Sequence, residues 1–248
     1  MKVKALITAA GMGKRFGALT RTTNKCLFHV DGKELIVHIL DRLREAGVSE
    51  AVVVTGYQRS RVERAVGHRA RAVFNPFYRV SGILGSFWQA RPYLDGKPFV
   101  FTTSDHFFHP SVLRDCLRVK SDICITVQRK KSYTREDAKV IIERSKVVRL
   151  GKDIPVSSAH GEFGGLTVFS ARASRAFFRE LEACFDKGDL GGYMMDIMSL
   201  VSHKHAMPIR YAFCGEEMRT EVDSVHDLRA ARHLSKVFKT GRGPKSRG

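Results

Sequence analysis

The sequence predicts an α/β protein whose mixed, mainly parallel sheet is flanked by helices. Short apolar runs alternate with segments of helical periodicity in the N-terminal part of the chain, which is the pattern of strand–helix–strand units. The run at 51–55 is almost entirely β-branched and apolar, as expected for a parallel strand that is buried on both faces. The run at 4–8 stops abruptly in small residues and glycines. Because ligands of such sheets bind beyond the carboxyl ends of the strands, these glycines mark the expected site.

The N-terminal elements follow one another as strand, helix, strand, helix and strand. Residues 34–47 carry apolar side chains on one helical face, and Gly47 supplies a helix stop. After the strand at 51–55, we expect a basic helix around 59–66 and a third strand at 71–75. Right-handed crossovers between these strands make them neighbours in one parallel sheet.

The rest of the chain adds further elements after a turn at 75–78. We expect a helix that opens near Ser86, and a hairpin formed by strands at 138–142 and 146–150. The other expected strands are 98–103, 122–127, 162–170 and 209–213, and the other expected helices are 111–118, 174–185, 194–198 and 227–234.

The glycines after the first strand suit the binding of phosphate groups. Ala9 and Ala10 lead into the turn, where Gly11 and Gly13 lack Cβ atoms and so allow unusual dihedrals and close approach of a ligand. Consecutive backbone N–H groups in such a turn form an anion-binding concavity. An ordinary βα turn is the alternative interpretation.

Two basic residues, Arg15 and Lys25, bring positive charge to the same end of the strand. The pattern is not the dinucleotide fingerprint, which needs a third glycine where Phe16 stands. It is not the Walker loop either, which needs glycine at Thr8 and a hydroxyl at Arg15. The residues alone therefore indicate nucleotide phosphates without naming a known loop.

The longer string that contains this turn resembles the signature of the sugar-phosphate nucleotidyltransferase superfamily. Its parts are Ala9-Ala10-Gly11-x-Gly13-x-Arg15, Leu19-Thr20, Asn24-Lys25 and Val30-x-Gly32-Lys33-x-Leu35-Ile36. Asn24 stands where most members have proline. The resemblance extends from residue 3 to about residue 234 and implies a Rossmann-like nucleotidyltransferase fold. It also implies that the loop cradles a triphosphate, that Arg15 neutralises the departing pyrophosphate and that Lys25 contacts the α-phosphate.

Two acidic residues stand at the ends of extended segments. Asp105 follows the strand at 98–103, where a carboxylate is costly unless it is paired or bound to a metal. Asp223 lies in an alternating segment that places Glu221 on the same face. Capping of the next turn or helix is the alternative for each acid. The resemblance assigns Asp105 and Asp223 to Mg²⁺, which takes hard oxygen ligands, and His106 is left open between a structural and a site-lining role.

The resemblance also indicates base-side and acceptor-side residues. In the family the segment around Ser86 passes under the nucleotide base, which makes Ser86 a candidate for base or ribose contact. Gly151-Lys152 follows the hairpin where sugar-phosphate members have Glu-Lys. Lys152 keeps the expected contact with the acceptor phosphate, and the missing acid argues against a hexose 1-phosphate; a plain surface lysine is the alternative. Glu162 lies in a run that similar cytidylyltransferases, including the phosphocholine enzymes, carry beside the acceptor.

These features imply a Mg²⁺-dependent nucleotidyltransferase of the cytidylyltransferase type. The expected donor is CTP, and the expected acceptor is inositol 1-phosphate, because Asp105-His106 looks like the inositol-phosphate cytidylyltransferases. The products would be CDP-inositol and pyrophosphate. Phosphocholine is the second acceptor candidate and a sugar 1-phosphate the third. The non-enzyme alternatives are a catalytically silent regulatory homologue and a basic nucleic-acid-binding protein.

Length and charge set the remaining expectations. The 248 residues suit one domain, expected at 1–234, followed by a basic tail at 235–248 that we expect to be disordered. The chain has 43 Lys and Arg against 25 Asp and Glu, a formal net charge of +18. Nucleic acid would fit this charge, but the basic residues are spread along the chain without an RNP-type aromatic pattern, so we expect small anionic substrates instead.

Cysteine usage and hydropathy indicate a cytoplasmic enzyme. The five cysteines are scattered and never in C-x-x-C spacing, so neither a disulfide framework nor a zinc site is expected. No stretch approaches the roughly 20 apolar residues of a membrane span. The composition does not specify an oligomeric state.

Overall fold

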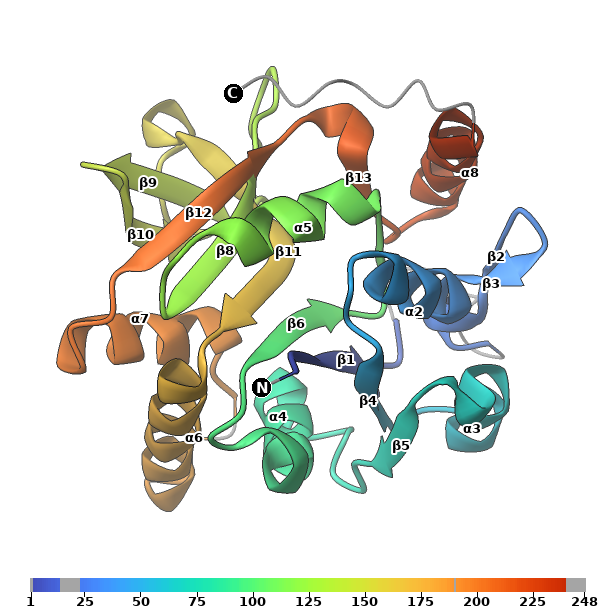
Figure 1. The fold of residues 1–248 in the computed structure, drawn as a ribbon, viewed down its shortest axis with the longest axis horizontal. Coiled ribbons are helices and arrows are strands. Elements are labelled where there is room, and N and C mark those ends of the chain that lie inside the picture. The colour runs from blue at the N-terminus through green and yellow to red at the C-terminus, as the bar shows by residue number, and fades with distance from the viewer. Residues whose placement is uncertain (1, 14–22, 190, 240–248) are drawn as a thin grey trace.

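One mixed sheet runs through the molecule and sets the position of the site. The computed structural model describes residues 2–13, 23–189 and 191–239. Within these residues the sheet has nine strands in the order β5-β4-β1-β6-β11-β8-β12-β10-β9 (Figure 1). The strands are β1 (Lys4–Ala9), β4 (Glu50–Thr55), β5 (Arg71–Phe74), β6 (Phe99–Thr103), β8 (Ile123–Gln128), β9 (Lys139–Glu143), β10 (Lys146–Gly151), β11 (Gly161–Phe169) and β12 (Ile209–Cys214). The predicted α/β fold class is confirmed.

Helices cover both faces of the sheet because the strands are apolar on both. The helices are α2 (Leu35–Glu45), α3 (Arg59–Val66), α4 (Gly82–Leu94), α5 (Pro110–Arg118), α6 (Ala171–Asp186), α7 (Met194–Lys204) and α8 (Val225–Lys239). Along β1, Ala5 and Ile7 belong to one core cluster and Leu6 to the other, which is the alternation of a strand buried on both faces. Figure 1 shows α4, α6 and α7 along one face and α2 and α5 along the other. None of the helices in the described ranges is both long and apolar enough to cross a bilayer.

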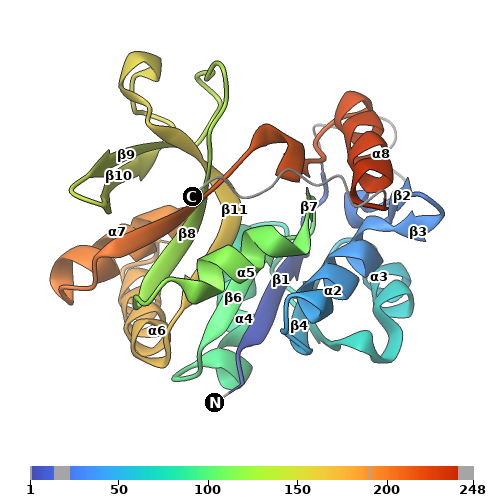
Figure 2. The same ribbon diagram turned by 45° about the horizontal axis from the view of Figure 1, so that its top comes forward.

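The two halves of the sheet differ in strand direction. In the N-terminal half, β5, β4, β1 and β6 are all parallel, so their carboxyl ends meet at one edge. In the other half, β11 runs antiparallel to both β6 and β8, and β10 pairs antiparallel with β9 and β12. The β9–β10 hairpin lies at the opposite end of the molecule from α3 (Figure 2).

Two small sheets complete the site side of the fold, and neither was predicted. Strand β7 (His106–Phe108) pairs antiparallel with β13 (Arg219–Glu221), and β2 (His29–Val30) pairs with β3 (Lys33–Glu34). Strands of two or three residues are too short to carry a readable alternation of apolar and polar side chains. The β7–β13 pair matters for function because it joins the two acidic motifs.

The C-terminal helix corrects the predicted tail. Helix α8 ends at Lys239, so residues 235–239 are not part of a disordered tail, and 240–248 lie outside the described residues. The Ser235 hydroxyl donates to the Asp31 carboxylate at 2.8 Å and the Lys239 ammonium lies 3.0 Å from the same group. Phe238 stacks on Phe107 with ring centroids 5.7 Å apart. These contacts with the body of the protein extend the helix past the last residue that the sequence pattern marked.

The start of α4 is also earlier than predicted. The helix begins at Gly82 rather than near Ser86, which places Ser86 in its second turn. Gly85 approaches Ser81 so closely that a Cβ at Gly85 would lie 2.0 Å from the Ser81 hydroxyl oxygen. The glycines that obscured the helical periodicity in the sequence therefore serve close packing at the helix start.

Candidate active site

A pocket of about 410 Å³ opens at the carboxyl ends of β1 and β6. It collects most residues that the sequence predicted for the nucleotide side, although these are far apart in the chain. Ala9, by contrast, is the buried last residue of β1 and directs the loop without lining the pocket. The lining residues are Thr8, Ala10, Gly11, Gly13, Asn24, Lys25, Tyr78, Gly82, Ile83, Ser86, Thr103, Ser104, Asp105 and Asp223.

Lys25 lies between the two predicted metal-binding acids. Its ammonium forms a short contact with Asp105 and lies 3.0 Å from the Asp223 carboxylate. Burial alone would lower the pKa of Lys25, but the two carboxylates outweigh it and raise that pKa above its ordinary value. Burial would likewise raise the pKa of Asp105, yet Lys25 and His106 hold it well below its ordinary range. At neutral pH the cluster therefore contains a cation between two carboxylates.

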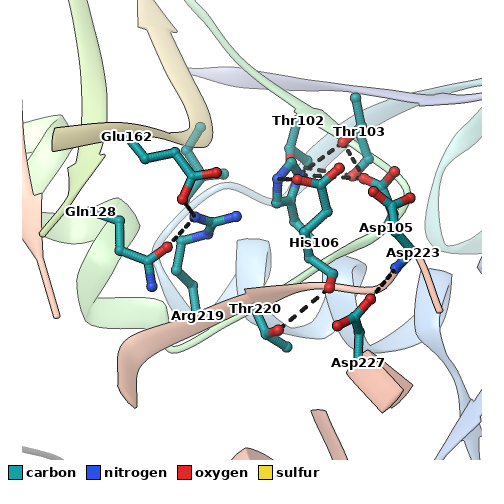
Figure 3. A network of polar contacts seen from close by, with 12 residues as sticks. Thr102, Thr103, Asp105, His106, Gln128, Glu162, Arg219, Thr220, Asp223 and Asp227 are labelled. Carbon is teal, nitrogen blue, oxygen red and sulfur yellow. Dashed lines mark hydrogen bonds and ion pairs between the residues drawn. The ribbon is translucent and has the colours of Figure 1, made fainter. Parts of the chain in front are cut away.

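The β7–β13 pair brings the second acidic motif to the first. Glu221 is opposite His106 in this antiparallel pair, and the backbone N–H of Val222 donates to the Asp105 carbonyl at 2.8 Å. These contacts place Asp223 beside Asp105, although more than 100 residues of sequence separate the two acids. Figure 3 shows the two carboxylates beside each other.

Asp223 is held in turn by the start of α8. The Asp227 carboxylate accepts hydrogen bonds from the Asp223 backbone N–H at 3.1 Å and from the Ser224 hydroxyl at 2.8 Å. The Ser224 hydroxyl accepts from the Asp227 backbone N–H at 3.2 Å, which is the reciprocal arrangement of a helix cap. Capping is therefore the role of Ser224 and Asp227, which leaves Asp223 to face Lys25.

His106 lines the acidic cluster as a neutral, oriented ring. Its Nδ1 atom lies 2.8 Å from the Thr103 hydroxyl, and that hydroxyl donates to Asp105. Because the hydroxyl has one proton, the His106 Nδ1–H must donate to it, which leaves Nε2 with its lone pair. Burial lowers the pKa of His106 to about 4. Gly165 packs directly on the ring, since a Cβ there would lie 2.1 Å from Nε2.

The donor set at this cluster fits a hard divalent cation. Asp105, His106 and Glu221 offer ligand atoms that lie within 4.8 Å of one another, and the neighbouring Asp223 adds a further carboxylate. Burial and the neighbouring Asp105 and Asp223 carboxylates raise the pKa of Glu221 to about 8, so at neutral pH this acid keeps its proton unless a bound cation displaces it. The Lys25 ammonium supplies positive charge in this structure, at a place where carboxylates and phosphates could hold a divalent ion.

Of the three remaining nucleotide-side residues, the structure describes Ser86 and Gly13. Ser86 lines the pocket with a buried hydroxyl, which lies 3.5 Å from the Asn75 side-chain nitrogen. Gly13 has a φ of +60°, a conformation that favours glycine. Arg15 lies outside the described residues, so its predicted role stays a prediction.

The acceptor-side residues are not brought together. Lys152 follows β10 with a half-exposed side chain, its ammonium 3.4 Å from the exposed Glu136, and it does not line the pocket. The Glu162 carboxylate instead lies 2.8 Å from Lys130 and 3.9 Å from Arg219. Figure 3 shows Glu162 and Arg219 on the far side of His106 from Asp223.

Two buried polar side chains of the site were missed from the sequence. Asn24 is 1% exposed and contacts the glycine loop, and its only signal was that it departs from the pattern of the resembling family. Arg219 is 3% exposed and donates to the Gln128 side chain. Its position two residues before Glu221 in an alternating segment was a usable signal for the same face.

The chain belongs to the family of MobA-like NTP transferase domains, whose model matches residues 5–206. The N-acetylmuramate α-1-phosphate uridylyltransferase of Neisseria meningitidis serogroup B is 38% identical over 108 residues, which are 42% of this chain and 47% of that protein. The CMP-5′-(3-aminopropyl)phosphonate synthase of Streptomyces rubellomurinus is 34% identical over 45% of this chain, and the match spans 18% of that longer protein. The chain thus spans less than half the length of these two relatives.

A further relative matches along nearly its whole length. The 2-aminoethylphosphonate cytidylyltransferase of Lancefieldella rimae is 26% identical over 242 residues, 94% of this chain and 93% of that protein. Among solved structures, the inositol-1-phosphate CTP transferase from T. maritima has a TM-score of 0.75 at 23% identity, with 97% of each chain covered. The CTP:phosphocholine cytidylyltransferase from Streptococcus pneumoniae has a TM-score of 0.74 at 20% identity, over 95% of this chain and all of that one. These two structures show the shared fold.

Proposed function

We propose that this member of the MobA-like NTP transferase family is a cytoplasmic, Mg²⁺-dependent cytidylyltransferase. It joins CTP to a small phosphorylated acceptor, with inositol 1-phosphate as the first candidate, and forms CDP-inositol and pyrophosphate. One observation carries the proposal: Lys25 lies between Asp105 and Asp223 in the pocket where the glycine loop ends. Nucleotidyl transfer requires a loop that binds phosphates, a cationic side chain such as that of Lys25, and a pair of carboxylates that can hold a metal ion.

The reaction needs no general base from the protein. A phosphate oxygen of the acceptor is already anionic and attacks the α-phosphorus of CTP, while the bond from that phosphorus to the bridging oxygen of the pyrophosphate breaks. Catalysis then consists of positioning and neutralisation of charge. Asp105 and Asp223 would hold Mg²⁺, whose charge offsets that of the phosphates and orients them.

The residues of this chain supply the rest of the site. The Lys25 side chain is flexible, so its ammonium exchanges its carboxylate partners for the α-phosphate when a nucleotide is bound. Arg15 neutralises charge on the leaving pyrophosphate, where negative charge grows during the reaction. Ser86 lines the pocket and is the candidate for contact with the base or ribose, and Lys152 and Glu162 are the acceptor-side candidates.

A second acceptor class has its own support. The relative that matches along nearly its full length is named for 2-aminoethylphosphonate, which makes an aminoalkyl phosphonate a specific alternative to inositol 1-phosphate. Such an acceptor has the same attacking oxygen but carries a cation at its other end. Glu162, which the sequence assigned to the acceptor side, is the candidate partner for that cation.

A substrate screen tests both candidates together. Purified protein with Mg²⁺ is incubated with each of the four common nucleoside triphosphates and a panel of acceptors: inositol 1-phosphate, phosphocholine, 2-aminoethylphosphonate and hexose 1-phosphates. We expect pyrophosphate release only when CTP and one of the first three acceptors are both present. Release with a different nucleotide would contradict the CTP assignment. If no acceptor of the panel leads to any release of pyrophosphate, a regulatory homologue without activity is the better interpretation.

A further inference from the structure

Asn24 is a buried amide at the point where three chain segments meet. Its side-chain nitrogen donates to the carbonyls of Ala9 at 3.0 Å, Gly11 at 3.3 Å and Tyr57 at 3.0 Å. Its side-chain oxygen accepts from the backbone N–H of Cys26 at 3.1 Å. The residue is 1% exposed, so water does not replace these bonds.

These bonds use the full donor capacity of the amide. A primary amide has two N–H groups, and three carbonyl oxygens share them here. No donor of Asn24 is left for a nucleotide, although the residue lines the pocket. Any effect of Asn24 on the reaction must therefore pass through the backbone that it holds.

The three carbonyls belong to two segments, of which the one that runs from the end of β1 into the glycine loop lines the pocket through Ala10 and Gly11. Ala9 and Gly11 bracket the start of the glycine loop, and Tyr57 lies in the turn between β4 and α3. The Tyr57 backbone N–H also donates to the Ala10 carbonyl at 3.0 Å. The neighbouring Gly56 lies so close that a Cβ there would be 2.7 Å from the Ala10 oxygen. Asn24 thus joins the glycine loop to a turn that is already packed against it.

The same side chain also fixes the backbone of Lys25. Asn24 is the N-cap of the 3₁₀ turn at Lys25–Leu27, and its side-chain oxygen provides the capping bond. Lys25 is the first residue of that turn and reaches from it to Asp105 and Asp223. One buried amide therefore connects the loop that would cradle the phosphates with the lysine that would meet the α-phosphate.

We propose that Asn24 is a positioning residue for nucleotidyl transfer, which sets the spacing between the glycine loop and Lys25. The inference rests on the proposed function. An alanine would leave the Ala9, Gly11 and Tyr57 carbonyls without their donor, and an aspartate would place a negative oxygen against them. A proline likewise has no side-chain donor. A displacement of about 1 Å in reacting groups reduces rates by roughly 100-fold.

The test compares Asn24→Asp, Asn24→Ala and Asn24→Pro with the wild type. Asn24→Asp keeps the oxygen that caps Cys26 and the shape of the side chain but replaces the donor by a charged acceptor, whereas Asn24→Ala removes the donor without adding charge. We expect kcat/KM for the nucleotide to fall about 10- to 100-fold in all three variants, with the acceptor KM within about twofold of the wild type. Ser174→Ala is the matched control, because it removes one buried hydrogen bond, to the Leu94 carbonyl at 2.8 Å, in α6.

A purely structural role would give a different pattern. It would lower Tm in the Asn24 variants as in Ser174→Ala, and leave kcat and both KM values within about twofold at temperatures well below Tm. That result would overturn the proposal. If a variant has too little activity to measure, calorimetric titration with CTP and with cytidine decides the question. Weaker binding of CTP with unchanged binding of cytidine supports displacement of the phosphate-binding groups. Unchanged binding of both ligands overturns the proposal.

Failure of the proposed function is distinguishable from failure of this inference. Pyrophosphate release by the wild type decides the function by itself. If the wild type releases none, the titrations with CTP and cytidine still decide whether Asn24 positions the phosphate-binding loop.

Discussion

The nucleotide side and the acceptor side of this site are built in different ways. On the nucleotide side, Lys25 reaches Asp105 across 80 residues of sequence and Asp223 across 198, and all three line one pocket. On the acceptor side, Lys152 pairs with an exposed acid and Glu162 with Lys130, and the two do not meet. The carboxyl ends of the parallel strands, together with the β7–β13 pair, thus gather the nucleotide-side residues, and the antiparallel half separates the acceptor-side ones.

The difference follows from where the residues lie on the strands. Residues that follow adjacent parallel strands reach the same sheet edge whatever the length of the crossovers. Asp105 follows β6 in this way, and the glycine loop follows β1. Residues next to a hairpin depend instead on the twist and bulges of two antiparallel strands, and β10 has an irregular register against β9 between Val147 and Arg149.

Removal of the Asp105 or Asp223 carboxylate should have the largest effect on catalysis. A small effect would contradict the description of the nucleotide side as the assembled half of the site. We expect Asp105→Asn and Asp223→Asn each to reduce kcat/KM by about 1000-fold or more, since several kcal/mol of charge stabilisation are lost with the metal. Steady-state pyrophosphate release in Mg²⁺ measures this. Asp122→Asn is the matched control because Asp122 pairs with Arg172 and Ser170 near the other end of the sheet. Near-normal turnover of either site variant would disprove the metal assignment.

Arg15→Ala should have the next largest effect, on kcat. Negative charge grows on the bridging oxygen as pyrophosphate leaves, so a guanidinium at that place stabilises the transition state more than the bound substrate. We expect kcat to fall roughly 100-fold and the KM for CTP to change by less than threefold. A change confined to KM would make Arg15 a binding residue only.

Lys152→Ala sharpens the comparison on the acceptor side. If the lysine holds the acceptor phosphate, the acceptor KM should rise about 10-fold or more, the effect of losing a charge-assisted bond of roughly 1.5–3 kcal/mol, while the KM for CTP stays within about twofold. Lys146→Ala is the control on the same hairpin. Unchanged acceptor kinetics in Lys152→Ala would contradict this role of the lysine. A raised acceptor KM in Lys130→Ala would then indicate that Lys130, which pairs with Glu162, binds the acceptor phosphate instead.

The smallest predicted effect concerns the free energy of unfolding and the ion pairs of Glu180 in α6. Burial would raise the pKa of Glu180, but Lys204 and His205 outweigh it and lower that pKa, with oxygens 2.7 and 2.8 Å from the two partners. Because the folded-state pKa is depressed, the stabilisation is full above the ordinary pKa of 4.5 and is lost as pH falls through the folded-state value. The free energies of unfolding of wild type and Glu180→Gln, measured with urea, should differ by about 1 kcal/mol at neutral pH and become equal in acid. An equal difference at both pH values would contradict the ion-pair explanation.

The sequence was sufficient for the strands of the parallel half because each of them carries a strong local signal. The run at 51–55 and the glycines after β1 are examples, and Lys25, Asp105 and Asp223 could be placed from motif resemblance. The β7–β13 pair could not be predicted, since its strands have only three residues each, yet it is the connection that brings Asp223 to Asp105. Asn24 could be noticed but not interpreted, because its partners are backbone carbonyls, which have no sequence signal.

The most direct test of nucleotidyl transfer follows the phosphorus atoms themselves. In ³¹P NMR of wild-type protein with Mg²⁺, CTP and the acceptor selected by the screen, the signals of CTP and acceptor should decline together. Pyrophosphate and one new species, in which the acceptor phosphorus is linked to CMP, should grow in equal amounts, and Asp223→Asn should show neither. Formation of CDP and orthophosphate, or of pyrophosphate with the acceptor signal unchanged, would show hydrolysis of the nucleotide and contradict transfer to an acceptor.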